Sequence, residues 1–111
     1  MITKQQILVF KHSADTLHAN LDFTCATILY FKTLFAIQDF VLLDKTGESP
    51  KDHAERFRKL EKHFPDLFRE LDVEFSTYRD TYSKIIDKET GLRIKRIVEH
   101  DINRYGIKES S

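Results

Sequence analysis

Apolar residues recur along this chain three or four residues apart, which is the spacing of one face of an α-helix. The clearest stripe lies between Pro65 and Ile85, and short polar or glycine-containing segments separate it from similar stretches on either side. The pattern therefore predicts five helices joined by short turns. Their expected ranges are Thr3–Ala19, Asp22–Leu43, Pro50–His63, Pro65–Ile85 and Asp87–Tyr105.

Residues that favour helix starts precede four of these helices, because Ser, Thr and Asp side chains accept hydrogen bonds from first-turn N–H groups. Gln6 stands three residues after the first of them, at the spacing of a capping box. Gly47 and Gly106 are expected to end the second and the last helix. Residues 20–22 would also fit one continuous helix, so that boundary stays open. The predicted N-caps are Thr3, Asp22, Ser49 and Asp87.

The second predicted helix is apolar around nearly its whole circumference, so it should occupy the centre of the domain. Residues 23–43 are long enough to cross a bilayer, but Lys32 and Asp39 interrupt them, and each central charge costs about 2.5–3.5 kcal/mol on insertion. We therefore expect a buried helix of a soluble protein without membrane contact. Any apolar surface that the other helices leave uncovered should bind a second copy of the chain.

The composition agrees with one helical domain. The chain has 111 residues with only 3 Gly and 2 Pro, too few for a fold with many tight turns. We predict an all-α fold over residues 1–111, an antiparallel bundle of four to five helices, with residues 106–111 as a frayed tail. Cys25 is the single cysteine, which excludes an internal disulfide and fits a cytoplasmic protein.

Several enzyme classes with short sequence signatures are excluded. The chain has no Gly-rich phosphate-binding loop and no nucleophile elbow, which argues against kinases, Rossmann enzymes and α/β-hydrolases. Its five histidines lack the spacing of a helical zinc motif. We accordingly predict no metal and no cofactor. The formal net charge of zero argues against a protein that coats nucleic acid, although it is compatible with a local basic patch.

Basic residues concentrate in two predicted helices, whereas the helix between them is acidic. Residues 51–63 and 93–108 carry an excess of Lys and Arg, and residues 65–80 an excess of Asp and Glu. Two basic helices side by side would form a face that binds phosphate groups. The alternative is a solvated surface with intrahelical pairs such as Glu55–Lys59. The candidate ligand-binding residues are Lys51, His53, Arg56, Arg93, Arg96 and His100.

Arg79 and Tyr82 are the candidate catalytic residues. They stand three residues apart near the end of the fourth predicted helix, so their side chains should lie on neighbouring faces. An arginine beside a phenol can hold a phosphate and donate to a developing oxyanion. The alternative is structural: Tyr78 and Tyr82 would belong to the core stripe, and Arg79 would pair with Asp72 or Glu74.

The order of these helices and short motifs along the chain is similar to the pattern of a known protein family. The central apolar helix leads through a Gly-containing turn to Pro50-x-x-His53, and a later helix ends near Arg79-x-x-Tyr82. Over residues 20–105 this order resembles the HEPN superfamily, small helical domains often paired with minimal nucleotidyltransferases. One large branch carries a Pro-x-x-His element at the first place. At the second it has an Arg-x-x-x-Asp-Tyr-like element, which is longer than the string here.

The resemblance implies a helical bundle that forms a homodimer, with one of two roles. Non-catalytic members are partners of a nucleotidyltransferase or bind a nucleotide, and we take this binding role, extended to RNA, as the leading hypothesis. Catalytic members are metal-independent RNases, often toxins of toxin–antitoxin pairs, with an Arg-x4–6-His motif. One such string, Arg93 to His100, lies in the last predicted helix, later than that motif should stand.

As an RNase, the chain would use Arg79 to hold the phosphate and Tyr82 to assist, with His53 or His100 contributing from elsewhere. A phenol with a pKa near 10 is a poor general base at neutral pH, so the binding role is favoured. An unrelated helical interaction domain is the third hypothesis.

Overall fold

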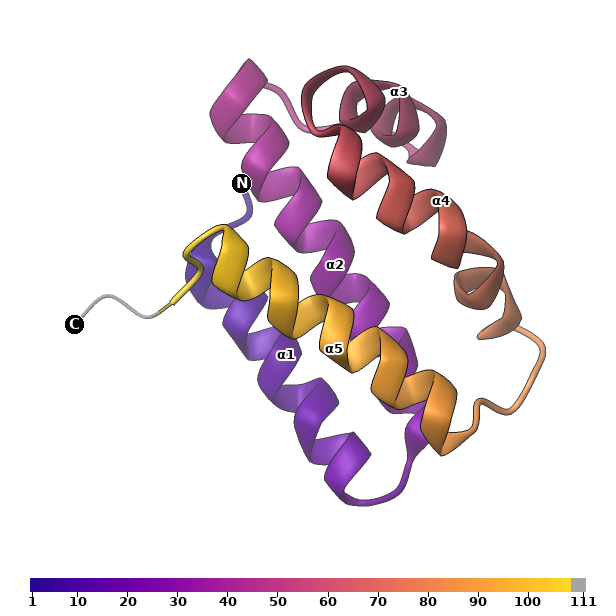
Figure 1. The fold of residues 1–111 in the computed structure, drawn as a ribbon. Coiled ribbons are helices and arrows are strands. Elements are labelled where there is room, and N and C mark those ends of the chain that lie inside the picture. Colours follow the sequence, from indigo (N-terminus) through magenta and orange to yellow (C-terminus); the bar gives the residue numbers. More distant parts are fainter. Residues whose placement is uncertain (109–111) are drawn as a thin grey trace.

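The computed structural model describes residues 1–108, and those residues contain five α-helices and no β-strand (Figure 1). The predicted all-α fold is therefore confirmed. The helices are α1 (Lys4–Ala19), α2 (Phe23–Thr46), α3 (His53–His63), α4 (Pro65–Asp80) and α5 (Lys88–Arg104).

Most of the predicted helix ends are confirmed by hydrogen bonds. Thr3 and Gln6 form the complete capping box, and Asp22 accepts a hydrogen bond from the N–H of Cys25. Asp87 likewise accepts from the N–H of Thr90, and Gly47 is left-handed with φ 79°. The helical conformation is interrupted between α1 and α2, where Leu21 also has a positive φ. The alternative of one continuous helix is therefore wrong.

The predicted start of α3 is wrong. The helix begins at His53, and its N-cap is Asp52, whose carboxylate accepts from the N–H of Glu55 at 2.8 Å. Ser49 lies outside the helix, and Pro50 precedes the cap instead of standing in the first turn. Two cap residues compete in this segment, and the ionised carboxylate is the stronger acceptor for a helix N-terminus.

The predicted end of α4 is also wrong, because the helix stops at Asp80 instead of Ile85. The hydroxyl of Thr81 donates to the carbonyl of Tyr78 at 2.6 Å and closes the last turn. The N–H of Ile86 then donates to Thr24 Oγ1 on α2, which draws the following segment across to the start of that helix. Tyr82 therefore lies in a turn and not on the helix.

The chain after α5 is partly buried. Ile107 is only 1% exposed and packs with Ile7, Ala36 and Ile37. The predicted frayed tail is therefore wrong at residue 107, because burying this apolar side chain fixes the segment that carries it. The rest of that prediction, for residues 109–111, lies outside the described residues.

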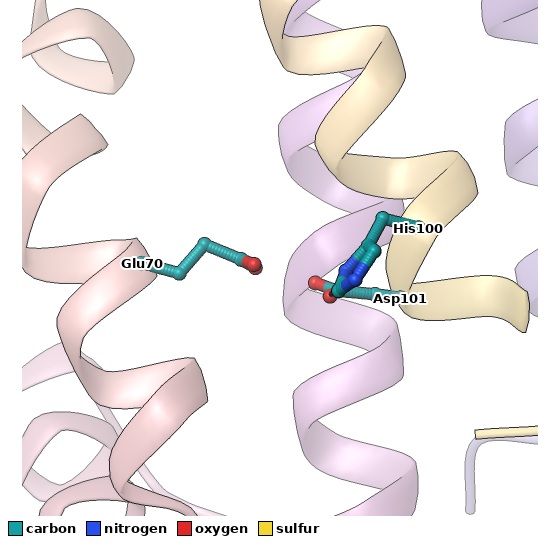
Figure 2. Close-up of side chains that lie close together, drawn as sticks. All are labelled: Glu70, His100 and Asp101. Atoms are coloured by element: carbon teal, nitrogen blue, oxygen red, sulfur yellow. Dashed lines mark hydrogen bonds and ion pairs between the residues drawn. The ribbon is translucent and has the colours of Figure 1, made fainter. Parts of the chain in front are cut away.

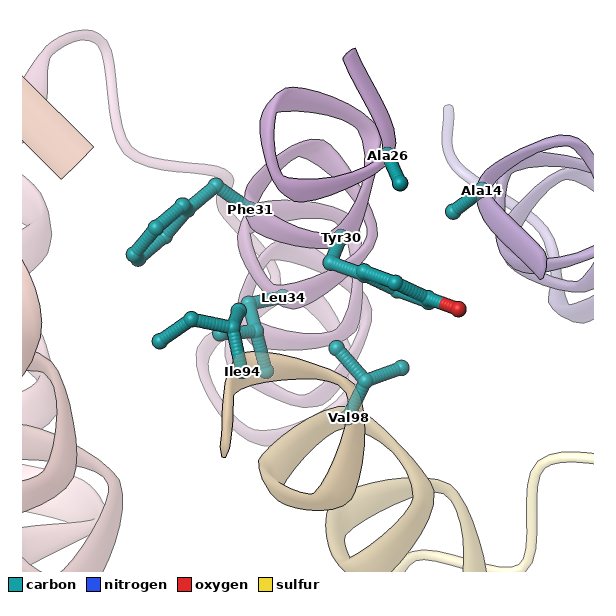
Figure 3. Close-up of a cluster of buried hydrophobic side chains, with 7 residues drawn as sticks. All are labelled: Ala14, Ala26, Tyr30, Phe31, Leu34, Ile94 and Val98. Atoms are coloured by element: carbon teal, nitrogen blue, oxygen red, sulfur yellow. The ribbon is translucent and has the colours of Figure 1, made fainter. Parts of the chain in front are cut away.

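Helix α2 occupies the centre, as predicted, and contacts α1, α3, α4 and α5 (Figure 1). Buried clusters follow one another along it. Figure 3 shows the first, in which Tyr30 projects between Ala14 of α1 and Val98 of α5. The second joins α2 to α3 and α4 through Leu42, Leu60 and other apolar residues, and the third contains Ile107.

Helix direction departs in one respect from an antiparallel bundle. Helices α1 and α2 are antiparallel, as the short connection between them requires (Figure 1). Helix α5 runs in the same direction as α2, because Gly91 near its start lies beside Thr27 near the start of α2. The segment 81–87 causes this by returning the chain to the beginning of α2 before α5 starts.

Little apolar surface of α2 remains exposed. Of its large apolar side chains, Ile28 alone is exposed, and others such as Phe35 and Phe40 are half-buried. In length and composition α2 could cross a membrane, and 61% of its most apolar window is buried within the fold. Burial of this kind is also usual for the core helix of a soluble protein.

Candidate functional site

A group of aromatic rings lies where α2, α3 and the end of α4 meet, and several predicted site residues belong to it. We call it the aromatic cluster. Each ring contacts at least one other in the group, with centroids 4.7–5.5 Å apart in the closest pairs. Its members are Phe35, His53, Phe57, Phe75, Tyr78 and Tyr82.

His53, the first residue of α3, lies among three of these rings. Its centroid is 4.7 Å from that of Phe35, 5.4 Å from Phe75 and 5.5 Å from Tyr78. Its Nδ1 is buried without a hydrogen-bond partner among residues 1–108. Burial, followed by the nearby Arg56 charge, lowers the pKa of His53. The imidazole is therefore neutral at pH 7, and its aromatic contacts orient the ring.

The two tyrosines connect this buried part of the cluster to the surface. The hydroxyls of Tyr78 and Tyr82 are 2.7 Å apart, within hydrogen-bond distance. Burial, together with that hydrogen bond, raises the pKa of Tyr78 to about 12. Tyr82 is 76% exposed, so the alternative that places it in the core is wrong. It presents a phenol ring to solvent from the turn after α4.

Arg79 is exposed and lies against one ring of the cluster. Its guanidinium carbon is 5.8 Å from the centroid of Phe75, a ring that His53 contacts as well. Of its expected partners, Glu74 is bound to Arg93, and no ion pair joins Arg79 to Asp72 or to any other described residue. Arg79 thus offers an available cation beside aromatic rings.

Arg56 points inward instead of forming a basic surface. Its side chain is 9% exposed, and Nη1 donates to Asp39 Oδ1 at 2.6 Å and to the carbonyl of Phe35 at 3.1 Å. The guanidinium also lies 5.0 Å from the Phe35 ring. Arg56 therefore holds α3 against α2 and supports the aromatic cluster from behind.

The predicted basic face is only partly formed. Arg93 donates from Nε to Glu74 at 2.8 Å and from Nη2 to Glu74 and Thr77, so it joins α5 to α4. Lys59 pairs with Glu55, as the alternative expected. Lys51 and Arg96 are exposed and remain available for a ligand.

His100 belongs to a second group, between α4 and α5. We call it the carboxylate–histidine cluster; Figure 2 shows its members Glu70, His100 and Asp101. One ligand atom from each lies within 4.8 Å of the others. Asp101 is 1% exposed, whereas the His100 side chain is 67% exposed. Burial and the facing Asp101 carboxyl raise the pKa of Glu70 to about 9.

Sequence reasoning found His100 but missed Glu70 and Asp101. Glu70 is 31 positions before Asp101, and no spacing rule connects two residues on different helices. The available signal was the acidic Asp101 at a position in step with inward-facing Ile94 and Val98, where an apolar residue would be expected. The aromatic cluster was missed as a unit for the same reason, because it joins three helices.

Comparison with known proteins gives no relative. No protein-family model matches the chain, and neither a curated protein nor a solved structure matches it significantly.

Proposed function

We propose that the chain is a HEPN-like helical binding module that holds a nucleotide or single-stranded RNA at the exposed edge of the aromatic cluster. One observation carries the proposal: Arg79, free of any ion pair among residues 1–108, lies on the edge of an aromatic cluster that presents the exposed ring of Tyr82. A guanidinium binds phosphate oxygens, and an exposed ring stacks on a base.

The HEPN assignment is supported by the all-helical fold and by the two sequence elements. Pro50-x-x-His53 places its histidine in the aromatic cluster, and Arg79-x-x-Tyr82 ends at the same cluster. We therefore extend the proposal to the family's associations: a homodimer in the cytoplasm that works with a minimal nucleotidyltransferase.

The binding role is tested by titrating fluorescently labelled single-stranded RNA, and ATP separately, with the purified protein and following anisotropy. Arg79→Ala should weaken binding about 10- to 100-fold, because a hydrogen bond to a charged group contributes about 1.5–3 kcal/mol. The matched control is Arg69→Ala, which removes the same charge from an exposed arginine on the same helix. Equal losses in the two variants would show non-specific charge attraction and contradict the proposal.

A metal-independent RNase is the second candidate, and His53 favours it specifically. This imidazole is neutral at pH 7 and contacts the same Phe75 ring as Arg79, so a base and a phosphate-binding cation lie near one another. RNA incubated with the protein in EDTA separates the two roles. Cleavage that disappears in both Arg79→Ala and His53→Ala would establish the enzyme, whereas binding without cleavage at high protein concentration would support the binding module.

The association with a nucleotidyltransferase needs a separate measurement. The tagged protein should be purified from its native host and the co-purifying proteins identified by mass spectrometry. Recovery of a nucleotidyltransferase would support the extended proposal. Its absence would contradict that partner without affecting the RNA titration.

A further inference from the structure

Two carboxylates on the same face of α4 have different partners on α5. Glu74 faces Arg93, which neutralises it with two hydrogen bonds of 2.8 and 3.0 Å. Glu70, one turn earlier on α4, faces Asp101 instead (Figure 2). The second pair thus brings two acidic groups together at a place where the first pair has an acid and a base.

Among residues 1–108, no lysine or arginine pairs with Glu70 or Asp101, and the one charged-group contact is that of His100 Nδ1 with Asp101 Oδ1 at 3.3 Å. The guanidinium of Arg104, also on α5, donates instead to Asp66 Oδ2 at 2.7 Å. Asp101 is 1% exposed, and its Oδ2 lacks any hydrogen-bond partner among residues 1–108. Oε1 of Glu70 is buried and unpartnered as well. Unpartnered buried carboxylate oxygens are costly, so the two facing carboxyl groups must share either a proton or a cation.

The three side chains of the carboxylate–histidine cluster are close enough to share one ion. Two ligand atoms on a tetrahedral zinc ion lie about 3.4 Å apart, given metal–ligand bonds of about 2.0–2.2 Å. The ligand atoms here lie within 4.8 Å of one another, and rotation of the Glu70 side chain can close that difference. The exposed imidazole of His100 gives an ion access from solvent.

We propose that Glu70, His100 and Asp101 bind one divalent transition-metal ion of the zinc class, which joins α4 to α5. Two carboxylates and one imidazole are ligands that zinc accepts, and three protein ligands leave a further position open to water. Magnesium and calcium fit less well, because they prefer oxygen ligands alone and in larger number.

The site is distinct from the aromatic cluster, so the two proposals fail independently. Among the candidate residues for nucleotide or RNA binding, the carboxylate–histidine cluster includes only His100, and Arg79 and Tyr82 contribute nothing to it.

The test is zinc binding to the untagged full-length protein after dialysis against EDTA, measured by isothermal titration calorimetry with zinc chloride. We expect one ion per chain and a higher melting temperature with zinc than with EDTA, since a ligand that binds only the folded state stabilises it. Glu70→Gln and His100→Ala should each weaken zinc binding about tenfold or more. Magnesium chloride should give no comparable shift.

The control is His12→Ala, which removes an exposed histidine on α1, outside the cluster, and should bind zinc as the wild type does. Circular dichroism of His100→Ala should match the wild type, because the lost side chain is largely exposed. Two results would overturn the proposal: a wild-type melting temperature that is the same in zinc and in EDTA, or equal zinc affinity in His100→Ala and His12→Ala.

Discussion

Asp15 joins the first two helices through a hydrogen bond to a buried side chain. The hydroxyl of Tyr30, a fully buried residue, donates to Asp15 Oδ1 at 2.5 Å, and Lys11 Nζ donates to Oδ2 at 2.6 Å. Burial by itself would raise the pKa of Asp15, but the hydrogen bonds from Lys11 and Tyr30 outweigh it and hold the pKa below its ordinary value of 3.8.

This lowered pKa predicts a stability that depends on acid pH. A carboxyl group with a lower pKa in the folded state stabilises the fold above its unfolded pKa of about 3.8, and that contribution is lost as the pH falls through the folded value. Asp15→Asn should therefore lower the free energy of unfolding at pH 7 and flatten its decline in acid.

The measurement is urea unfolding at intervals from about pH 7 to about pH 2. Asp72→Asn is the matched control, because Asp72 is an exposed carboxylate on α4 and forms no ion pair within residues 1–108. Parallel stability curves for the wild type and Asp15→Asn would contradict the role assigned to this carboxylate.

Individual side-chain partners were the least predictable feature at this scale. The sequence offered Asp72 or Glu74 as a partner for Arg79, because both lie within two turns of it on the same helix. Glu74 instead binds Arg93 of α5. Which face of a helix meets its neighbour depends on packing across the whole interface, and a single helix does not contain that information.

At the scale of helices, α3 has two nearby candidate N-caps, Asp52 and Ser49, which substitutions can distinguish. Asp52→Ala should lower the free energy of unfolding by about 1 kcal/mol, because the N–H of Glu55 loses its acceptor. Ser49→Ala should change it by less than about 0.5 kcal/mol, as for an ordinary surface substitution. Thermal and urea unfolding of the two variants provide the comparison. A larger loss of unfolding free energy in Ser49→Ala would show that Ser49 is the N-cap instead.

Helices α2 and α5 approach closely at Gly91. A methyl group there would lie 3.2 Å from Thr27 Oγ1 and 3.7 Å from Phe23 Cβ. The Thr27 hydroxyl is held by its hydrogen bond to the carbonyl of Phe23 at 2.7 Å. The sequence indicates only that glycine weakens the first turn of α5, by about 1 kcal/mol relative to alanine. The structure shows what offsets this cost of glycine: without a side chain at Gly91, α5 can pack closely on α2.

Helix existence and most caps could be predicted from the sequence because they depend on residues three or four apart. Thr3, Asp22, Asp87 and Gly47 act within one turn of their own positions. The end of α4 could not be predicted in this way. It depends on Thr24, which is 62 positions from its partner Ile86 and binds the chain after the helix has ended.

At the scale of the molecule, the homodimer stays a prediction, but its expected surface changes. On α2 only Ile28 is exposed among the large apolar side chains, whereas Ile85 is 93% exposed in the segment after α4. We expect light scattering at micromolar concentration to give a dimer mass for the wild type and a monomer mass for Ile85→Asp. Leu21→Asp, at the exposed joint between α1 and α2, is the control and should remain a dimer. A monomeric wild type would contradict the prediction.

The candidate site was predictable in its residue types and not in its arrangement. Arg79, Tyr82 and His53 were identified individually, and the structure brings them to one aromatic cluster. Arg56 and Arg93 were identified too, but they hold helices together, because a carboxylate on a neighbouring helix binds each of them. The same sequence pattern of arginines thus serves both the surface and the interior.

The burial of Ile107 against Ile7 has a consequence for synthesis of the chain. These residues are 100 positions apart, and the ammonium group of Lys4 also donates to the carbonyl of Gly106 at 3.3 Å. During synthesis, α1 therefore lacks part of its packing until residue 107 has emerged as well. Helices α2, α3 and α4 can collapse earlier through their own shared cluster, whereas α1 gains its remaining contacts only after α5 and the segment behind it are released.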